Sequence, residues 1–387
     1  MVSRRVRALK LVVTLAAAVL LLCTPAFAAG QRDVLLVGNS GDGTVDVFDA
    51  HSFQRLDAIN AIPDGNTPRD PIQALAYPTL VSREGIDYVQ DIALSPDGRV
   101  LYVSRGYLGD VAAFDMRTHA MLWRVEVNSL RADHLALSPD GSRLYVSALT
   151  SDAVEAIDTR AGRIVGAGAA GDWPHTIGFS PDGRTLYSGS LGVQLLDGAA
   201  GQPPPTDGRH WLAALDPSTL RIERACELGA GIRPFTLTPR GDVAYLQLSY
   251  YNGVVAYDPV HCRTLARLDL PYSDAARRLS PQQYPNEAAQ HGIALSADGR
   301  WLCSAGTIDD YAALISLPAF RLATTIAVGQ EPGWAVNSPD GRYCFVSSRG
   351  ARANTVSAIS YASQREVARF ATGKHPQVEL SARIPAS

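Results

Sequence analysis

Charged and histidine side chains recur at one position of a pattern that repeats along this 387-residue chain. His175, Arg233 and His291 each stand five residues before the serine or threonine of a turn, and Asp133 stands at the same place in another repeat. Imidazole, guanidinium and carboxylate groups that meet in one place can bind an anion, hold a metal ion or transfer protons. The spacing therefore predicts a polar site built from several copies of one structural unit.

Further polar residues flank this position in the other repeats. We predict that eight residues form a ligand-binding site: Gln90, Asp91, Asp133, His134, His175, Arg233, His291 and Trp334. An anionic or polar small molecule suits the arginine and the histidines, and a protein partner could use the same surface. Either aspartate could fix a histidine tautomer or join a metal ion, so the pattern admits a metal cofactor without identifying one. No catalytic residue is identifiable, and polar groups at a channel mouth can also serve only to satisfy backbone groups and trapped water.

The turns that follow these residues determine the architecture. The tetrapeptide Ser-Pro-Asp-Gly begins at residues 95, 138, 180 and 338, a looser copy begins at Ser296, and a degenerate copy begins at Thr238. The steps between them are 43, 42, 58, 58 and 42 residues. A period of about 40–45 residues of strands and turns is typical of a β-propeller with one four-stranded blade per repeat. The two longer steps predict the same blade with an insertion.

One repeat shows how the residues form a blade. Residues 134–137 are a short apolar strand, and after the turn residues 143–147 form a strand rich in β-branched and aromatic side chains. Residues 153–158 alternate with period two, and residues 162–165 form the outer strand.

The two ends of the chain are predicted to close the ring. Three strands within residues 34–59 have no innermost partner, and residues 377–381 read as an inner strand with no blade after it. We therefore predict an all-β, seven-bladed propeller over residues 33–387, in which the C-terminal strand completes the N-terminal blade and leaves no open edge.

The repeat resembles a known family. The run Leu-Ser-Pro-Asp-Gly-Arg-x-Leu-Tyr-Val-Ser, followed by a valine-containing strand that ends in Asp, resembles the YVTN β-propeller repeat family over residues 33–384. The resemblance implies a cell-surface, periplasmic or ligand-binding propeller, and it is specific for the fold rather than for a function. It carries over no catalytic residue, because the matched positions are turns and core strands. Neighbouring families include lactonases, amine-dehydrogenase heavy chains and the copper-bearing domain of nitrous-oxide reductase, whose many histidine ligands are missing here.

Three insertions are expected on one face of the disc, opposite the Ser-Pro-Asp-Gly turns. They comprise residues 60–88, 189–209 and 271–290. Long loops carry function more often than core strands do. We predict that they form a rim or lid over the central mouth, where the polar residues lie.

The first 28 residues read as a secretory signal peptide. Four basic residues precede an apolar run, and Ala26-Phe27-Ala28 is a small-x-small cleavage site. The mature protein is therefore expected outside the cytoplasm, secreted or periplasmic, without a membrane span. Four cysteines remain after cleavage: Cys226, Cys262, Cys303 and Cys344. Because packed sheets lie about 10 Å apart, farther than the Cα atoms of a disulfide, we predict four buried free thiols.

Charge narrows the function classes. The chain has 38 acidic and 35 basic residues, and four of the basic ones precede the cleavage site, which leaves a net negative mature protein. Such a surface argues against binding to nucleic acid or anionic membranes. Two functions remain: a monomeric exported binding or scaffold propeller, or an enzyme, either a metal-assisted hydrolase of the lactonase kind or a subunit of a periplasmic redox complex.

Overall fold

The repeated turn is held by its own side chains. Ser95 Oγ donates to Asp97 Oδ1 at 2.6 Å and accepts from the Val100 amide at 2.9 Å, while Gly98 takes a φ of 71° that favours glycine. The serine–aspartate bond recurs in the turns that begin at residues 138, 180, 296 and 338. In the degenerate turn Thr238 Oγ1 donates instead to Asp242, at 2.6 Å. The same local chemistry thus joins the innermost strand to the second strand in six blades.

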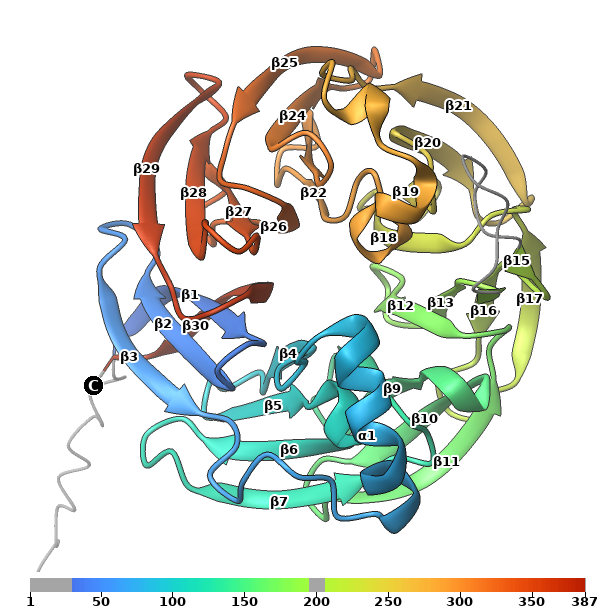
Figure 1. Cartoon of the computed structure of the whole chain (residues 1–387), viewed down its shortest axis with the longest axis vertical. Helices are drawn as coiled ribbons and strands as arrows, with labels where there is room; N and C mark the ends of the chain where they lie inside the picture. Colours follow the sequence, from blue (N-terminus) through green and yellow to red (C-terminus); the bar gives the residue numbers. More distant parts are fainter. Residues whose placement is uncertain (1–29, 195–205, 387) are drawn as a thin grey trace, which may run out of the picture.

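These turns belong to seven four-stranded antiparallel sheets arranged in a ring (Figure 1). The computed structural model describes residues 30–194 and 206–386. The predicted all-β, seven-bladed fold is confirmed. The signal peptide predicted over residues 1–28 lies outside the described residues.

The strands of each blade follow one another from the axis outward. Blade 1 contains β30 (Pro376–Pro385), β1 (Gln31–Asn39), β2 (Thr44–Asp49) and β3 (Arg55–Asn60). Blade 2 contains β4 (Asp91–Leu94), β5 (Val100–Ser104), β6 (Asp110–Asp115) and β7 (Met121–Glu126). Blade 3 contains β8 (Ala132–Leu137), β9 (Arg143–Ala148), β10 (Ala153–Asp158) and β11 (Arg163–Ala169). Blade 4 contains β12 (Pro174–Phe179), β13 (Leu186–Ser190), β16 (Trp211–Leu215) and β17 (Ile222–Glu227).

The remaining blades repeat this order. Blade 5 contains β18 (Ile232–Leu237), β19 (Ala244–Leu248), β20 (Gly253–Asp258) and β21 (Arg263–Asp269). Blade 6 contains β22 (Ile293–Leu295), β23 (Trp301–Gly306), β24 (Tyr311–Ser316) and β25 (Arg321–Ala327). Blade 7 contains β26 (Pro332–Asn337), β27 (Tyr343–Ser348), β28 (Thr355–Ser360) and β29 (Arg365–Ala371).

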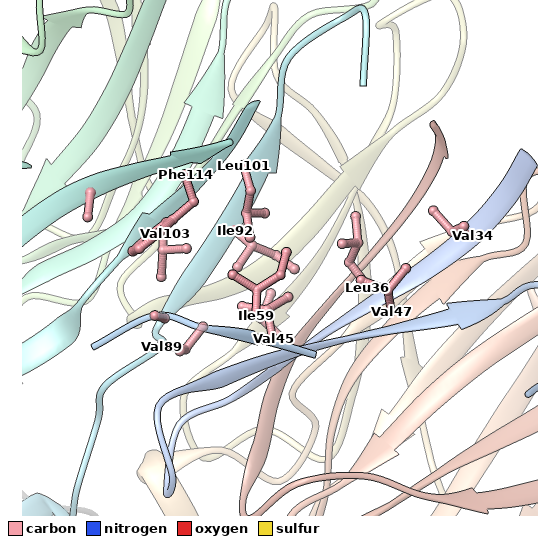
Figure 2. Close-up of a cluster of buried hydrophobic side chains, with 13 residues drawn as sticks. Val34, Leu36, Val45, Val47, Ile59, Val89, Ile92, Leu101, Val103 and Phe114 are labelled. Atoms are coloured by element: carbon pink, nitrogen blue, oxygen red, sulfur yellow. The ribbon is translucent and has the colours of Figure 1, made fainter. Parts of the chain in front are cut away.

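The core is divided among the interfaces between blades. Each pair of neighbouring blades encloses its own cluster of buried apolar side chains, because successive residues of a strand point to opposite faces of the sheet. In β1, Val34 and Leu36 pack toward blade 2, whereas Leu35 and Val37 pack toward blade 7. Figure 2 shows the cluster between blades 1 and 2, to which Val34 and Leu36 of blade 1 and Ile92 of blade 2 belong.

The C-terminal strand closes the ring as predicted. β30 pairs antiparallel with β1 from Gln31 opposite Pro385 to Asn39 opposite Pro376. It also contributes apolar side chains to the cluster shown in Figure 2. The two ends of the chain are therefore joined within one sheet.

Two of the insertions carry helices that the sequence did not predict. Residues 60–88 include α1 (Pro71–Glu84), whose N-terminus is capped by the Asp70 side chain and begins with a proline at the first position. Gln73 Nε2 ties α1 to blades 2 and 3 by donating to the Tyr107 carbonyl at 2.7 Å and the Leu130 carbonyl at 2.6 Å.

The insertion before blade 6 contains three short 3₁₀ helices, η3 (Ala276–Arg278), η4 (Pro281–Gln283) and η5 (Pro285–Glu287). Both this segment and α1 extend inward over one face of the ring (Figure 1). The insertion in blade 4 adds the short pair β14 (Val193–Gln194) and β15 (Thr206–Asp207). No helix of the described residues combines the length and apolar character needed to cross a bilayer.

The prediction of four free thiols is wrong. Cys303 of β23 and Cys344 of β27 form a disulfide between blades 6 and 7, with Cα atoms 6.5 Å apart. Blades converge toward the axis, so neighbouring second strands lie closer than the 10 Å spacing of parallel-stacked sheets. Cys226 of β17 is bonded to Cys262, which lies in the turn between β20 and β21 of the next blade, with Cα atoms 5.1 Å apart.

Candidate functional site

Irregular pairing at the start of the inner strands places the polar side chains. In β8 the ladder to β9 pairs Ala132 with Ala148 and then Leu135 with Val146, so Asp133 and His134 lie opposite a single residue. β12 and β18 repeat this bulge at His175-Thr176 and Arg233-Pro234. A bulge of this kind turns side chains out of the regular alternation. In blades 3, 4 and 5 the polar position of the repeat therefore coincides with a backbone irregularity at the start of the inner strand.

A chain of hydrogen bonds links these positions around the mouth. Arg349 Nη1 donates to Gln377 Oε1 at 2.7 Å, and Gln377 Nε2 donates to Gln90 Oε1 at 3.3 Å. Gln90 Nε2 in turn donates to Asp133 Oδ1. Each of these side chains is buried, so the bonds supply the partners that desolvated polar groups require.

Three histidines and a tryptophan form an aromatic cluster beside this chain. The ring of His134 stacks on Trp334 with centroids 5.1 Å apart and meets the ring of His175 at 4.5 Å. His291 lies 5.7 Å from His175 and 5.9 Å from Trp334. The histidines are 1–4% exposed. Contacts that tight leave each ring little freedom to rotate.

The environment shifts the pKa values of these histidines in different directions. Burial, together with the neighbouring His134 and Arg233 charges, lowers the pKa of His175 well below its usual value. Burial and Arg349 do the same to the pKa of His291. Burial also opposes a charge on His134, but Asp91 outweighs it and raises the pKa of that ring.

A cleft of about 120 Å³ opens beside these residues. Its lining comes from several blades and from all three insertions: Leu80, Gln90, Tyr107, Leu130, Arg131, Leu149, Thr150, Trp173, His175, Leu191, Arg233, Asn286, Glu287 and Gln377. The insertions thus meet at the mouth, as the sequence predicted. The cleft is narrower than the several hundred Å³ typical of sites for drug-sized ligands.

Two arginines of the cleft lie close to carboxylates. Arg233 Nη2 donates to Glu287 Oε2 at 2.6 Å, and its Nε donates to Ser249 Oγ at 3.0 Å. Arg131 lies 3.4 Å from Asp87 and 3.9 Å from Asp133, and its guanidinium also packs over the Tyr107 ring. The lining of the cleft therefore combines cationic, anionic and apolar side chains.

The structure brings all eight predicted site residues to one end of the channel. Gln90, His175 and Arg233 line the cleft. Asp133, His134, His291 and Trp334 pack beside them through the contacts described above. Asp91 joins them through a 2.8 Å hydrogen bond between its Oδ2 and His134 Nδ1.

Sequence reasoning missed several members of the site. Arg131 and Trp173 lie just outside the inner strands, two residues before the repeated position. Arg349 follows β27, and Glu287 belongs to an insertion that has no counterpart in other repeats. His175 and Arg233 were identified by their position five residues before the turn. The position seven residues before the turn would have identified Arg131 and Trp173 in the same way. No sequence signal pointed to Arg349 or Glu287.

Asp133, His134 and His175 are the one group of metal-ligating side chains that the described residues bring together. One ligand-type atom from each lies within 4.8 Å of the others, and all three residues are buried. Two imidazoles and a carboxylate are donors that first-row transition metals accept. The cleft can therefore contact an anion through Arg233, and the adjoining cluster has the donors of a metal site.

Comparison with known proteins places the fold in context. The profile of a family described as "Lactonase, 7-bladed beta-propeller" matches residues 27–165, less than half of the chain. No curated protein sequence matches the chain.

Solved structures share the architecture at low sequence identity. A hydrazine synthase chain of Kuenenia stuttgartiensis superposes with a TM-score of 0.64 at 17% identity, covering 85% of this chain and 92% of that one. A Bacteroides fragilis protein named as a candidate 6-phosphogluconolactonase gives 0.64 at 14% identity, covering 91% and 98%. The dihydro-heme d1 dehydrogenase NirN gives 0.57 at 14% identity, covering 90% and 66%. At these identities the likeness extends to the fold alone.

Proposed function

We propose that the protein is an exported binding propeller that holds a small anionic or polar molecule in the mouth cleft. One observation carries this proposal. Buried charged side chains from several blades meet at the cleft, and the three insertions, which the other repeats lack, contribute to its lining. Arg233 is only 2% exposed, a costly position for a cation that serves only as a surface group.

The ligand is expected to be small and to carry at least one negative charge. The contacts of Arg233 to Ser249 and Glu287 use Nε and Nη2, so Nη1 can donate to a carboxylate or a phosphate oxygen. Leu80, Leu130 and Trp173 supply an apolar wall for the rest of the molecule. A volume of about 120 Å³ suits a small molecule rather than a drug-sized one.

Calorimetric titration of the metal-free mature protein tests the proposal, with succinate and inorganic phosphate as anionic probes and glycerol as a neutral one. We expect at least one anion, but not glycerol, to bind. Arg233→Gln should weaken that binding about 10- to 100-fold, the usual worth of a charge-assisted hydrogen bond. Arg240→Gln, at an exposed arginine in a Ser-Pro-Asp-Gly-type turn, is the control and should bind as the parent does. Equal binding by the Arg233 variant, or none by the parent, would contradict the proposal.

A second candidate is hydrolysis of a lactone. It is favoured by the family profile, whose match includes Asp91, Asp133 and His134 of the mouth. The test is the rate of gluconolactone opening above the spontaneous rate, with and without added Zn²⁺. A rate unaffected by His175→Gln would place any activity outside the mouth.

Export, membership of the YVTN repeat family and a monomeric state are part of the same proposal. Two disulfides support an oxidising compartment, because cytoplasmic thiols are normally kept reduced. N-terminal sequencing of protein from the extracytoplasmic fraction should find a chain that starts near Ala29. An unprocessed chain confined to the cytoplasm would contradict export.

A further inference from the structure

The three metal-ligating side chains come from two adjacent inner strands. Asp133 and His134 occupy the bulge of β8, and His175 occupies the equivalent bulge of β12. His134 Nε2 lies 3.8 Å from Asp133 Oδ1, and the rings of His134 and His175 lie 4.5 Å apart. Ligand atoms around one tetrahedral ion at 2.0–2.2 Å are separated by about 3.3–3.6 Å, so small side-chain movements would bring the three donors onto one ion.

Hydrogen bonds orient both imidazoles. His134 Nδ1 bonds to Asp91 Oδ2 at 2.8 Å, and because a carboxylate only accepts, this nitrogen carries the proton. Asp91 also accepts from the Leu135 amide at 2.9 Å, which fixes the carboxylate itself. His175 Nδ1 bonds to Thr176 Oγ1 at 2.9 Å. A carboxylate on the far nitrogen of a ring is the usual support of a metal-bound histidine.

Two of the candidate metal-ligating atoms are buried and lack a hydrogen-bonding partner among the described residues. Across residues 30–194 and 206–386, neither His134 Nε2 nor Asp133 Oδ2 has a hydrogen bond. Burying such groups without a partner costs free energy, and one ion between them would satisfy both. Arg131, 3.9 Å from Asp133, balances only part of the negative charge that Asp91 and Asp133 place here.

We propose that Asp133, His134 and His175 form a binding site for a divalent first-row transition-metal ion. Zn²⁺ fits best, because two imidazoles and one carboxylate leave a fourth position open, as in catalytic zinc sites. Ca²⁺ and Mg²⁺ prefer oxygen donors throughout and fit poorly. Since His175 also lines the cleft, the open position is accessible to a ligand held there. The site goes beyond the proposed anion binding, which is tested on metal-free protein.

The experiment uses the mature chain without a purification tag, stripped with a chelator and dialysed. Titration with Zn²⁺ alone should show one equivalent bound, and Zn²⁺ should raise the melting temperature, since it binds only the folded state. Co²⁺ in the same site should give the intense visible absorption of a four-coordinate ion with nitrogen ligands. A parent protein that takes up no Zn²⁺, or that gives only the weak spectrum of six-coordinate aqueous Co²⁺, would overturn the proposal.

Variants then locate the site. His175→Gln and Asp133→Asn should each lower Zn²⁺ affinity by 100-fold or more, and Asp91→Asn by about 10- to 100-fold, because Asp91 acts through His134. His210→Gln is the matched control: His210 is also buried, 6% exposed, but lies in blade 4 away from the cluster, and this variant should bind as the parent does. Unchanged affinity in both His175→Gln and Asp133→Asn would place the ion elsewhere. If a variant fails to fold, the parent titration and the Co²⁺ spectrum still decide.

Discussion

At the scale of single residues, the mouth shows how one backbone irregularity serves different chemistry in each blade. The bulge positions hold Asp133-His134, His175-Thr176 and Arg233-Pro234 in three successive blades. Because the bulge is a property of the backbone, the side chain at that position can change without altering the blade. A repeat fold can thus assemble a site from unlike residues at one recurrent position.

Glu379 is a buried carboxylate in β30, the innermost strand of blade 1. The side chain is 2% exposed, so its carboxyl group is shielded from water. Burial raises its pKa well above the usual value of 4.5.

Glu379 should therefore make stability depend on pH. The folded state favours the protonated acid, so its unfavourable contribution is absent below about pH 4.5 and grows as the pH rises above the unfolded pKa. We expect Glu379→Gln to raise the melting temperature at pH 8, by about 1–2 °C for each kcal/mol relieved, and to leave it unchanged at pH 4. Thermal unfolding monitored by circular dichroism measures this, with Glu223→Gln at an exposed position of β17 as the control. An equal shift at both pH values would show that the effect is packing rather than charge.

At the scale of elements, the sequence predicted the strands well and the inserted segments poorly. Period-two alternation and the Ser-Pro-Asp-Gly turns repeat in most blades, so the strand prediction in one repeat is supported by the same pattern in the others. The insertion holding α1 occurs once. Its Asp70-Pro71 start is a recognisable helix signal, but Pro78 within the helix weakens the pattern. The bulges are invisible in the sequence because they depend on how two strands pair.

The disulfides were mispredicted for a related reason. Their formation depends on the distance between neighbouring blades, which the ring geometry sets, rather than on residues near each cysteine. Cys303 and Cys344 are both 0% exposed and lie within the apolar cluster between blades 6 and 7. That bond therefore joins two blades at their packed faces.

We expect the two bonds to stabilise the protein measurably. Thiol titration of the denatured, unreduced mature protein should find no free thiol, and reduction should release four. Each closes a segment of about 36–41 residues, so replacing one pair by alanine should cost about 2–4 kcal/mol. Denaturant unfolding of the Cys303→Ala/Cys344→Ala and Cys226→Ala/Cys262→Ala variants measures this cost. Four thiols before reduction would contradict the assigned bonds, and unfolding curves like that of the parent would contradict the predicted stabilisation.

At the scale of the whole molecule, closure joins the fold to the site. β30 supplies the innermost strand of blade 1, and its first residues also contribute Gln377 to the hydrogen-bonded chain at the mouth. The same strand therefore completes both the ring and the polar site. Without β30, the inner edge of β1 would be unpaired at the axis.

Removing β30 tests this dependence. A chain that ends at Gly373 would leave the edge of β1 unpaired and uncover the cluster that Val378 fills with its neighbours in blades 1 and 2. We expect this protein to aggregate or to unfold well below the parent's melting temperature, with no anion binding at the mouth. A chain that ends at Pro385 keeps all of β30 and is the control, so it should melt as the parent does. Size-exclusion chromatography and thermal unfolding measure both outcomes. A soluble, monomeric Gly373 chain with the parent's melting temperature would show that the six complete blades hold the ring without the C-terminal strand.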